Sequence, residues 1–138
     1  MDFNMMYDIA KNNIKPQKLN KHAKIGDAVC VMISDTNQIY LGVSLVATCG
    51  LGYCAEQSAI SQMLNNGETR IKTILVVDKF DNILPPCGRC VELITQININ
   101  NKDADIFLSK DNCIKLSTLM PYDWKDIKDA SVKRSMSD

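Results

Sequence analysis

Residues 54–90 decide the fold of this chain, and they read CAEQSAISQMLNNGETRIKTILVVDKFDNILPPCGRC. Apolar side chains recur at helical spacing over residues 54–64, and the Asn-Asn-Gly that follows predicts the end of a helix. Residues 71–77 are mostly β-branched and apolar, which predicts a strand buried on both faces. A loop closed by two prolines then leads into a second helix that ends near residue 97. A buried strand between two helices indicates a layered α/β sandwich.

The flanking segments extend this pattern on both sides. On the N-terminal side we predict a short helix, a hairpin of two strands and a glycine-containing loop, over residues 2–14, 28–33, 39–46 and 47–53. On the C-terminal side we predict two short strands and a charged helix, over residues 104–108, 113–116 and Asp123 to about Met136. The order α-β-β-α-β-α-β-β-α and the length of 138 residues predict a single domain over residues 1–138.

Composition excludes several classes of protein. Lys plus Arg equals Asp plus Glu, at 16 each, so the net charge gives no reason to expect a nucleic-acid partner. We also expect no membrane partner, because no apolar run approaches the length of a membrane span. Asp2, Asn4 and Asp8 interrupt the N-terminal residues, which do not resemble a signal peptide. We therefore expect a cytoplasmic protein, in which the six cysteines are reduced and serve as metal ligands, catalytic thiols or core residues.

Three cysteines occur where a predicted loop meets a predicted helix. Cys54 begins one helix, and Cys87 and Cys90 lie three residues apart at the start of the next. The N-terminus of a helix carries a partial positive charge, so we expect lowered pKa values for these thiols and readiness to bind a metal. Three protein ligands leave tetrahedral zinc one open position, which is typical of catalytic rather than structural sites.

Glu56 lies two residues after Cys54, in the first turn of the same predicted helix. Water coordinated to zinc loses a proton far more readily than bulk water. A carboxylate that faces such a water can accept the proton and pass it to a leaving amine. The residues Cys54, Glu56, Cys87 and Cys90 therefore indicate metal-assisted hydrolysis with Glu56 as the general acid and base.

The motifs Cys54-Ala55-Glu56 and Pro86-Cys87-Gly88-Arg89-Cys90 resemble those of the cytidine deaminase superfamily, in its small subfamily with three cysteine ligands. Cytidine deaminases and blasticidin S deaminases both belong to that subfamily. The resemblance covers nearly the whole chain, including a closing Leu-x-Pro segment at residues 119–121. It implies an α/β fold, a three-layer α-β-α sandwich built on a mixed five-stranded sheet.

The resemblance also implies roles for individual residues. Cys54, Cys87 and Cys90 would hold one zinc ion per subunit, and Glu56 would carry protons. The backbone around Ala55 and Pro85 would contact the pyrimidine ring. The implied reaction converts a cytosine-type ring of a nucleoside to a uracil-type ring plus ammonia, and the implied assembly is a homotetramer.

The substrate-contacting positions depart from the cytidine deaminase pattern. Ser44 and Val46 stand where those enzymes carry Asn-x-Glu to bind ribose, and no Phe precedes the first strand to stack on the base. Gln57 replaces the usual Arg, for which Arg89 and the two helix ends could compensate. Blasticidin S deaminases also lack that Glu and that Arg, so the alternative hypothesis is that the protein deaminates an antibiotic of the blasticidin S type. Ser44 remains a candidate substrate contact.

Other interpretations stay open at the level of sequence. Cys87 and Cys90 alone could form a redox pair, and Cys49 could complete a closed, catalytically silent four-cysteine zinc site. The chain could also be a relative that binds nucleosides without converting them. We expect Cys30 and Cys113 to be core residues and His22 to be solvated in a Lys-rich loop. Tyr122 and Trp124 either close a neighbouring subunit's site or anchor the C-terminal segment.

Overall fold

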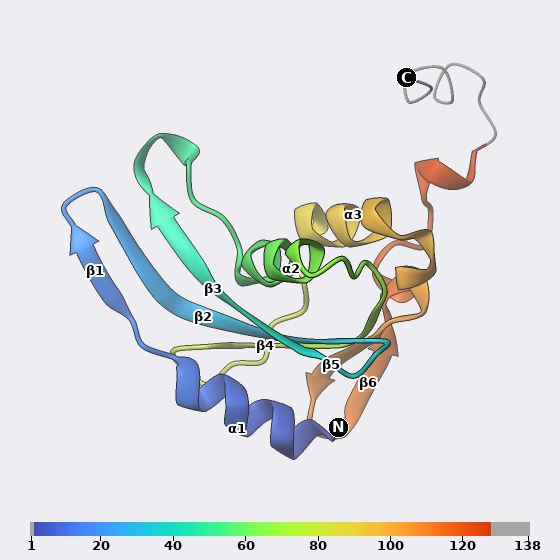
Figure 1. Ribbon diagram of the computed structural model, residues 1–138, viewed down its shortest axis with the longest axis horizontal. Helices are drawn as coiled ribbons and strands as arrows, with labels where there is room; N and C mark the ends of the chain where they lie inside the picture. Colours follow the sequence, from blue (N-terminus) through green and yellow to red (C-terminus); the bar gives the residue numbers. More distant parts are fainter. Residues whose placement is uncertain (1, 128–138) are drawn as a thin grey trace.

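The computed structural model describes residues 2–127, which form a mixed sheet with helices on both faces (Figure 1). The strands are β1 (Gln17–Asn20), β2 (Ala23–Ser34), β3 (Ile39–Ala47), β4 (Ile71–Asp78), β5 (Asp105–Ser109) and β6 (Asn112–Lys115). The helices are α1 (Phe3–Asn13), α2 (Ala55–Asn65) and α3 (Gly88–Ile97). Within residues 2–127, β4 and β5 are the only strands that pair in parallel, and the other neighbouring strands pair antiparallel.

The three layers follow from the alternation of side chains along β2 and β4. One face of these strands packs against α1, where Met6 and Ala10 are fully buried against Val29, Val31 and Leu75. The opposite face carries α2 and α3, which lie side by side above the sheet in Figure 1. Because helices cover both faces of the central strands, the sequences of these strands are continuous apolar runs rather than alternating patterns. The predicted three-layer α-β-α sandwich is confirmed.

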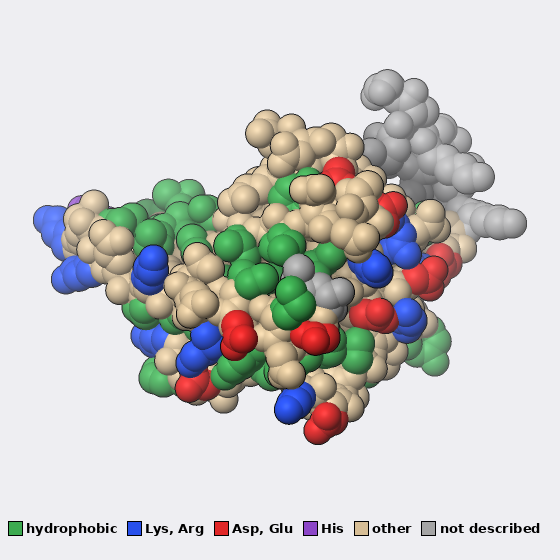
Figure 2. Space-filling model, turned by 60° about the horizontal axis from the view of Figure 1, so that its bottom comes forward, with side chains coloured by type: hydrophobic (Ala, Val, Ile, Leu, Met, Phe, Trp, Pro, Cys, Tyr) green, Lys and Arg blue, Asp and Glu red, His purple; other side chains and the backbone are tan. Residues whose placement is uncertain are grey.

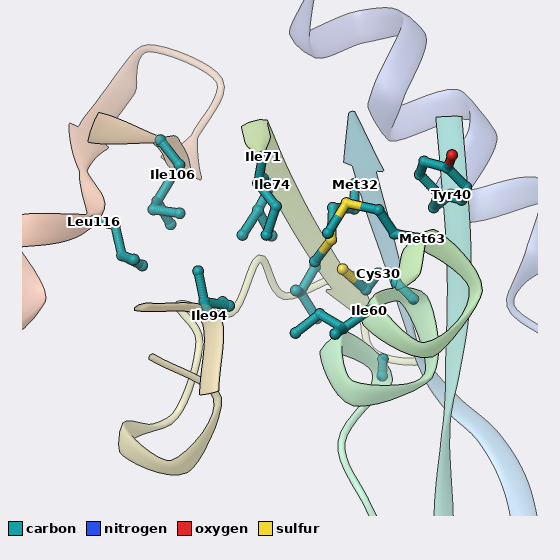
Figure 3. Packing of buried hydrophobic residues seen from close by; sticks show 14 of the residues in the cluster. Cys30, Met32, Tyr40, Ile60, Met63, Ile71, Ile74, Ile94, Ile106 and Leu116 are labelled. Atoms are coloured by element: carbon teal, nitrogen blue, oxygen red, sulfur yellow. The ribbon is translucent and has the colours of Figure 1, made fainter. Parts of the chain in front are cut away.

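The larger core lies between the sheet and the pair α2 and α3 (Figure 3). Met32 and Ile74 from the sheet meet Ile60 and Met63 from α2 and Ile94 from α3. Cys30 is fully buried within this core, as the sequence predicts. Cys113 is exposed on the edge strand β6, so its predicted place in the core is wrong. Strand position alone does not bury a residue at the edge of a sheet.

Gly42 sets how closely α2 approaches the sheet. A Cβ atom at Gly42 would lie 2.2 Å from the carbonyl oxygen of Ala55 and 2.3 Å from the backbone nitrogen of Ala59. Both of those atoms belong to the backbone of α2, which side-chain rotation cannot move away. The absence of a side chain in the middle of β3 therefore places the first turn of α2 directly on the strand.

Asn101 fixes the junction between α3 and β4. Its side chain is fully buried, accepts a hydrogen bond from the backbone N–H of Ile71 at 2.7 Å, and donates to the carbonyls of Thr69 and Ile94 at 2.9 Å each. A buried amide that satisfies three backbone groups holds those segments in one relative position. The end of α3 is thereby tied to the start of β4.

In the described part of the chain the sheet has six strands, where the resemblance implies five. The additional strand is β1, and β2 begins at Ala23 rather than at residue 28. All four β1 residues are exposed, so they lack the apolar pattern by which a strand is recognised from sequence. A glycine at φ +85°, Gly26, and a shift in the strand register separate this outer half of β2 from its buried half.

The predicted helix from Asp123 to about Met136 is wrong over the described part of that range. Residues Trp124–Asp126 form a single 3-10 turn, and Ile127 is extended. The remaining predicted helical residues lie outside the described residues. Ion pairs hold the segment around Asp123 in place, because Asp123 pairs with Lys102 at 2.8 Å and with Lys125 at 3.0 Å. Of the helices in residues 2–127, none is long and apolar enough to cross a membrane.

Candidate metal centre and active site

The structure brings together the three cysteines that the sequence singles out. The Sγ atoms of Cys54 and Cys87 lie 3.7 Å apart and those of Cys87 and Cys90 lie 3.5 Å apart, and all three lie within 4.8 Å of one another. Tetrahedral zinc with Zn–S bonds of about 2.3 Å separates its sulfur ligands by about 3.8 Å. The donor set and its spacing therefore fit a zinc ion bound by three thiolates. We call these residues the cysteine cluster.

Each cysteine occupies a helix start, as predicted. Cys54 and Cys87 are the N-cap residues of α2 and α3, and Cys90 lies in the first turn of α3. Gln57 accepts a hydrogen bond from the backbone N–H of Cys54 at 3.1 Å and so fixes the entry into α2. Gln57 therefore has a structural task at the position where the resembled enzymes carry Arg.

The expectation of lowered thiol pKa values holds for only one of the three cysteines. Burial raises the pKa of Cys54, and burial together with the charge of Glu56 raises the pKa of Cys90 far above its ordinary value. For Cys87 burial also acts to raise the pKa, but hydrogen bonds from Cys90, Cys54 and the backbone N–H of Arg89 outweigh it and lower the pKa. Desolvation is the largest cause of the raised pKa at Cys54 and Cys90, and a cation between the sulfurs would offset it.

Glu56 lies beside the cysteine cluster with only 5% of its surface exposed. Burial raises the pKa of this carboxyl group, and hydrogen bonds from its own backbone N–H and from Cys90 partly offset the rise. A carboxylate with a raised pKa accepts a proton more readily near neutral pH than an ordinary glutamate does. Glu56 has no ion-pair partner among residues 2–127, so no ion pair in the described fold offsets the free-energy cost of burying its carboxylate.

The predicted substrate contacts line one small cavity with these groups. Ser44, Ala55 and Pro85 surround a volume of about 170 Å³ together with Cys54, Glu56 and Cys87. The Ser44 hydroxyl accepts a hydrogen bond from the backbone N–H of Ala28 at 3.0 Å, which leaves its own proton free to donate. We call this volume the site cavity. Three further residues line it that sequence reasoning missed, and these are Ala28, Val76 and Leu84.

Two other predicted features lie apart from the cluster. Cys49 is exposed in a 3-10 turn and is absent from the group of sulfur atoms within 4.8 Å, so the described residues do not form a four-cysteine site. The Arg89 side chain is exposed, and its contribution to the cluster is a backbone N–H. Whether Arg89 compensates the thiolate charge stays a prediction.

Tyr122 and Trp124, which follow the Leu-x-Pro segment, have different environments. Trp124 donates a hydrogen bond from its ring nitrogen to Glu92 on α3, and Lys125 pairs with the same carboxylate. These contacts match the anchoring role that the sequence left open for this segment. Tyr122 is 95% exposed and makes no such contact among the described residues.

Comparisons with known proteins agree with this geometry. Residues 6–102 match the family model described as the cytidine and deoxycytidylate deaminase zinc-binding region. The fold resembles a cytidine deaminase from Mycobacterium leprae with a TM-score of 0.72 and 20% identity, over 88% of this chain and 99% of that one. It also resembles the Mycobacterium tuberculosis cytidine deaminase, with a TM-score of 0.74 and 20% identity over 90% of this chain and 98% of that one. For the Bacillus anthracis cytidine deaminase the TM-score is 0.70 and the identity is 15%, over 98% of each chain. With the family model covering more than half of its length, the chain belongs to the cytidine and deoxycytidylate deaminase zinc-binding family.

Proposed function

We propose that this protein is a zinc-dependent deaminase that hydrolyses the amine of a cytosine-type ring to give a uracil-type ring and ammonia. The observation that carries the proposal is the buried Glu56 carboxyl group beside three sulfur atoms spaced for zinc. A protein that only bound nucleosides would gain nothing from desolvating this carboxylate, and a closed zinc site would need a fourth ligand.

The chain's own residues would divide the work as follows. Cys54, Cys87 and Cys90 would hold the zinc ion, which lowers the pKa of a coordinated water and so makes a nucleophile available at neutral pH. Glu56 would accept the proton that this water loses and give it to the ring nitrogen next to the amine-bearing carbon. The same carboxylate would take the second proton of the water and deliver it to the amine as it leaves, so Glu56 ends the cycle deprotonated.

The site cavity would hold the ring. Its volume of about 170 Å³ lies below the roughly 300–1,000 Å³ of pockets that enclose a whole drug-sized ligand. The apolar side chains of Val76 and Leu84 supply a low-dielectric wall, and the Ser44 hydroxyl and the backbone around Ala55 and Pro85 supply polar contacts. A ring would therefore be enclosed here while its substituent extended beyond the cavity.

Ammonia release tests the proposal directly. The zinc-loaded protein would be supplied in parallel with cytidine, deoxycytidine, cytosine, cytidine 5′-monophosphate and blasticidin S, and ammonia and the absorbance change of the ring would be followed. Release from at least one compound is expected. Blasticidin S is a second candidate substrate because the apolar Val46 occupies a position at which cytidine deaminases bind ribose. Zinc-loaded protein that releases no ammonia from any of them would contradict the proposal.

We also propose one zinc ion per subunit and a homotetramer, both of which follow from the family resemblance. Metal analysis of the purified protein would give the stoichiometry, and light scattering during size-exclusion chromatography would give the mass relative to the 15.4 kDa chain. A ratio of one zinc per chain and a mass near four chains are expected.

A further inference from the structure

The β1–β2 hairpin carries a concentration of positive charge that the net charge of the chain conceals. Residues 15–24 read KPQKLNKHAK and contain a lysine at every third position, the only histidine of the chain and no acidic residue. Figure 2 shows blue lysine side chains and the purple histidine gathered at the end of the molecule where Figure 1 places this hairpin. The charge is therefore local and lies on a projecting element.

These side chains surround a second cavity, which we call the hairpin cavity. It has a volume of about 250 Å³ and is lined by Lys18, Asn20, Lys21, His22, Ala23, Lys24 and Val46. Lys24 pairs with Asp27 at 3.0 Å and is partly neutralised. Lys18 and Lys21 have no carboxylate within ion-pair distance among residues 2–127. The hairpin cavity thus presents uncompensated ammonium groups, an amide and an imidazole to one volume.

The hairpin cavity and the site cavity lie along the same face of β3. Ser44 lines the site cavity and Val46 lines the hairpin cavity, and residues two apart on a strand point to the same face at a separation of about 7 Å. Val46 pairs with Lys24 across β2 and β3, and Lys24 pairs with Lys18 across β1 and β2, so these lysines share the face of Val46. Cys54 is close to this row, because Tyr53 pairs with Leu45.

We propose that the hairpin cavity binds an anionic group, a phosphate or a carboxylate, that is part of the substrate whose amine-bearing ring lies in the site cavity. This inference rests on the proposed deaminase function and specifies its substrate class. The site cavity accommodates a ring but no large substituent, and the next cavity along the same strand face is lined by lysine, asparagine and histidine side chains and by no carboxylate. Ammonium groups donate charge-assisted hydrogen bonds to phosphate and carboxylate oxygens, so an oxyanion is the matching ligand.

The test compares anionic and neutral substrates in a variant that removes two charges from the hairpin. The zinc-loaded wild type, the double variant Lys18→Gln with Lys21→Gln, and the control Lys72→Gln with Lys110→Gln would each be assayed by ammonia release. Both double variants lose two positive charges, and Lys72 and Lys110 are exposed outside either cavity. Substrates would be cytidine, cytidine 5′-monophosphate and cytidine 5′-carboxylic acid.

We expect a higher kcat/KM for one or both anionic compounds than for cytidine, by about tenfold or more. The hairpin variant should lower the ratio of kcat/KM between the anionic compound and cytidine by a similar factor, and the control variant should leave that ratio unchanged. Which of the two anions is preferred identifies the source of the charge. Cytidine as the better substrate, or equal ratios in all three proteins, would overturn the anion site while leaving the deaminase in place.

Calorimetric binding of cytidine 5′-monophosphate and of cytidine 5′-carboxylic acid to the same three proteins separates this inference from the proposed function. If no compound releases ammonia, weaker binding by the hairpin variant than by the control variant would still support the anion site and would reject the deaminase. Equal binding of each of the two anions by the hairpin variant and the control variant would overturn the anion site.

Discussion

The cysteine cluster and the β1–β2 hairpin show two ways in which one chain builds a chemical environment. The cluster is held by helix starts that pack on a buried sheet, where apolar contacts place α2 and α3 and Gly42 allows the close approach of α2, whose N-cap is Cys54. The hairpin is exposed along β1, and it is held by the backbone pairing of β1 with the part of β2 that extends beyond the core. The first region is therefore suited to chemistry that requires fixed geometry, and the second to charge recognition that tolerates adjustment.

Replacement of Glu56 by Gln should produce the largest effect. The substitution keeps the size of the side chain but removes the proton acceptor, so we expect kcat to fall by about 10²–10⁴-fold while the zinc content is unchanged. Steady-state assays and metal analysis would measure both quantities. The matched control is Glu68→Gln, because Glu68 lies outside the site cavity and hydrogen-bonds to Tyr40 and Thr36. A fully active Glu56→Gln protein would remove Glu56 from the mechanism.

Asn101→Ala tests whether the scaffold of the cluster depends on one buried amide. The variant leaves the Ile71 N–H and two carbonyl groups without their partner, so the free energy of unfolding should fall by about 2 to 4 kcal/mol. Urea denaturation followed by circular dichroism would measure the change. Asn100→Ala, at an exposed neighbouring position, should change the stability by less than about 0.5 kcal/mol. Equal effects of the two substitutions would contradict the role of the Asn101 network.

Hydrogen exchange should distinguish the two regions without mutation. The amides of β1 and of Ala23–Ile25 belong to an exposed hairpin, whereas Val29–Ile33 are buried on both faces. Local opening of the hairpin requires little apolar exposure, so we expect its amides to exchange about a hundredfold faster or more than those of Val29–Ile33. Exchange monitored by NMR would measure these rates. Uniform protection along the whole of β2 would mean that the hairpin is part of the rigid core.

The smallest expected effect concerns a third region, the segment around Asp123, which ion pairs hold in place. Burial acts to raise the pKa of Asp123, but hydrogen bonds from Lys102 and Lys125 outweigh it and lower the pKa to about 2 from an ordinary 3.8. The ionised side chain therefore stabilises the fold fully above about pH 4, and this contribution is lost as the pH falls through about 2. Asp123→Asn should reduce the difference in urea midpoint between pH 7 and pH 2.5. Asp126→Asn, at an exposed carboxylate, should reduce it less.

The sequence was sufficient to predict the cluster and the layers around it. The cysteines at two helix starts and the apolar runs of β2 and β4 can each be recognised within a short stretch of sequence. The structure brings those cysteines together as expected. The pKa values of the thiols could not be predicted, because the burial that raises them at Cys54 and Cys90 depends on tertiary packing.

The hairpin and the sheet contacts were harder to predict. Strand β1 has no apolar periodicity, so sequence does not reveal it. The need for glycine at position 42 depends on the close packing of α2 on β3, which is a tertiary contact. A usable signal was nevertheless present for the hairpin cavity, since lysine recurs at every third position over residues 15–24 without any acid. The charge balance of the whole chain hid that local excess.

X-ray absorption spectroscopy at the zinc edge of the purified, zinc-loaded protein would show whether the cysteine cluster forms an open zinc site. We expect three sulfur ligands at about 2.3 Å and one oxygen ligand at about 2.0 Å, which is the coordination of an open catalytic site. Four sulfur ligands would bring in a cysteine from outside the cluster and would contradict the account, because a closed site leaves no position for the water on which the proposed reaction depends.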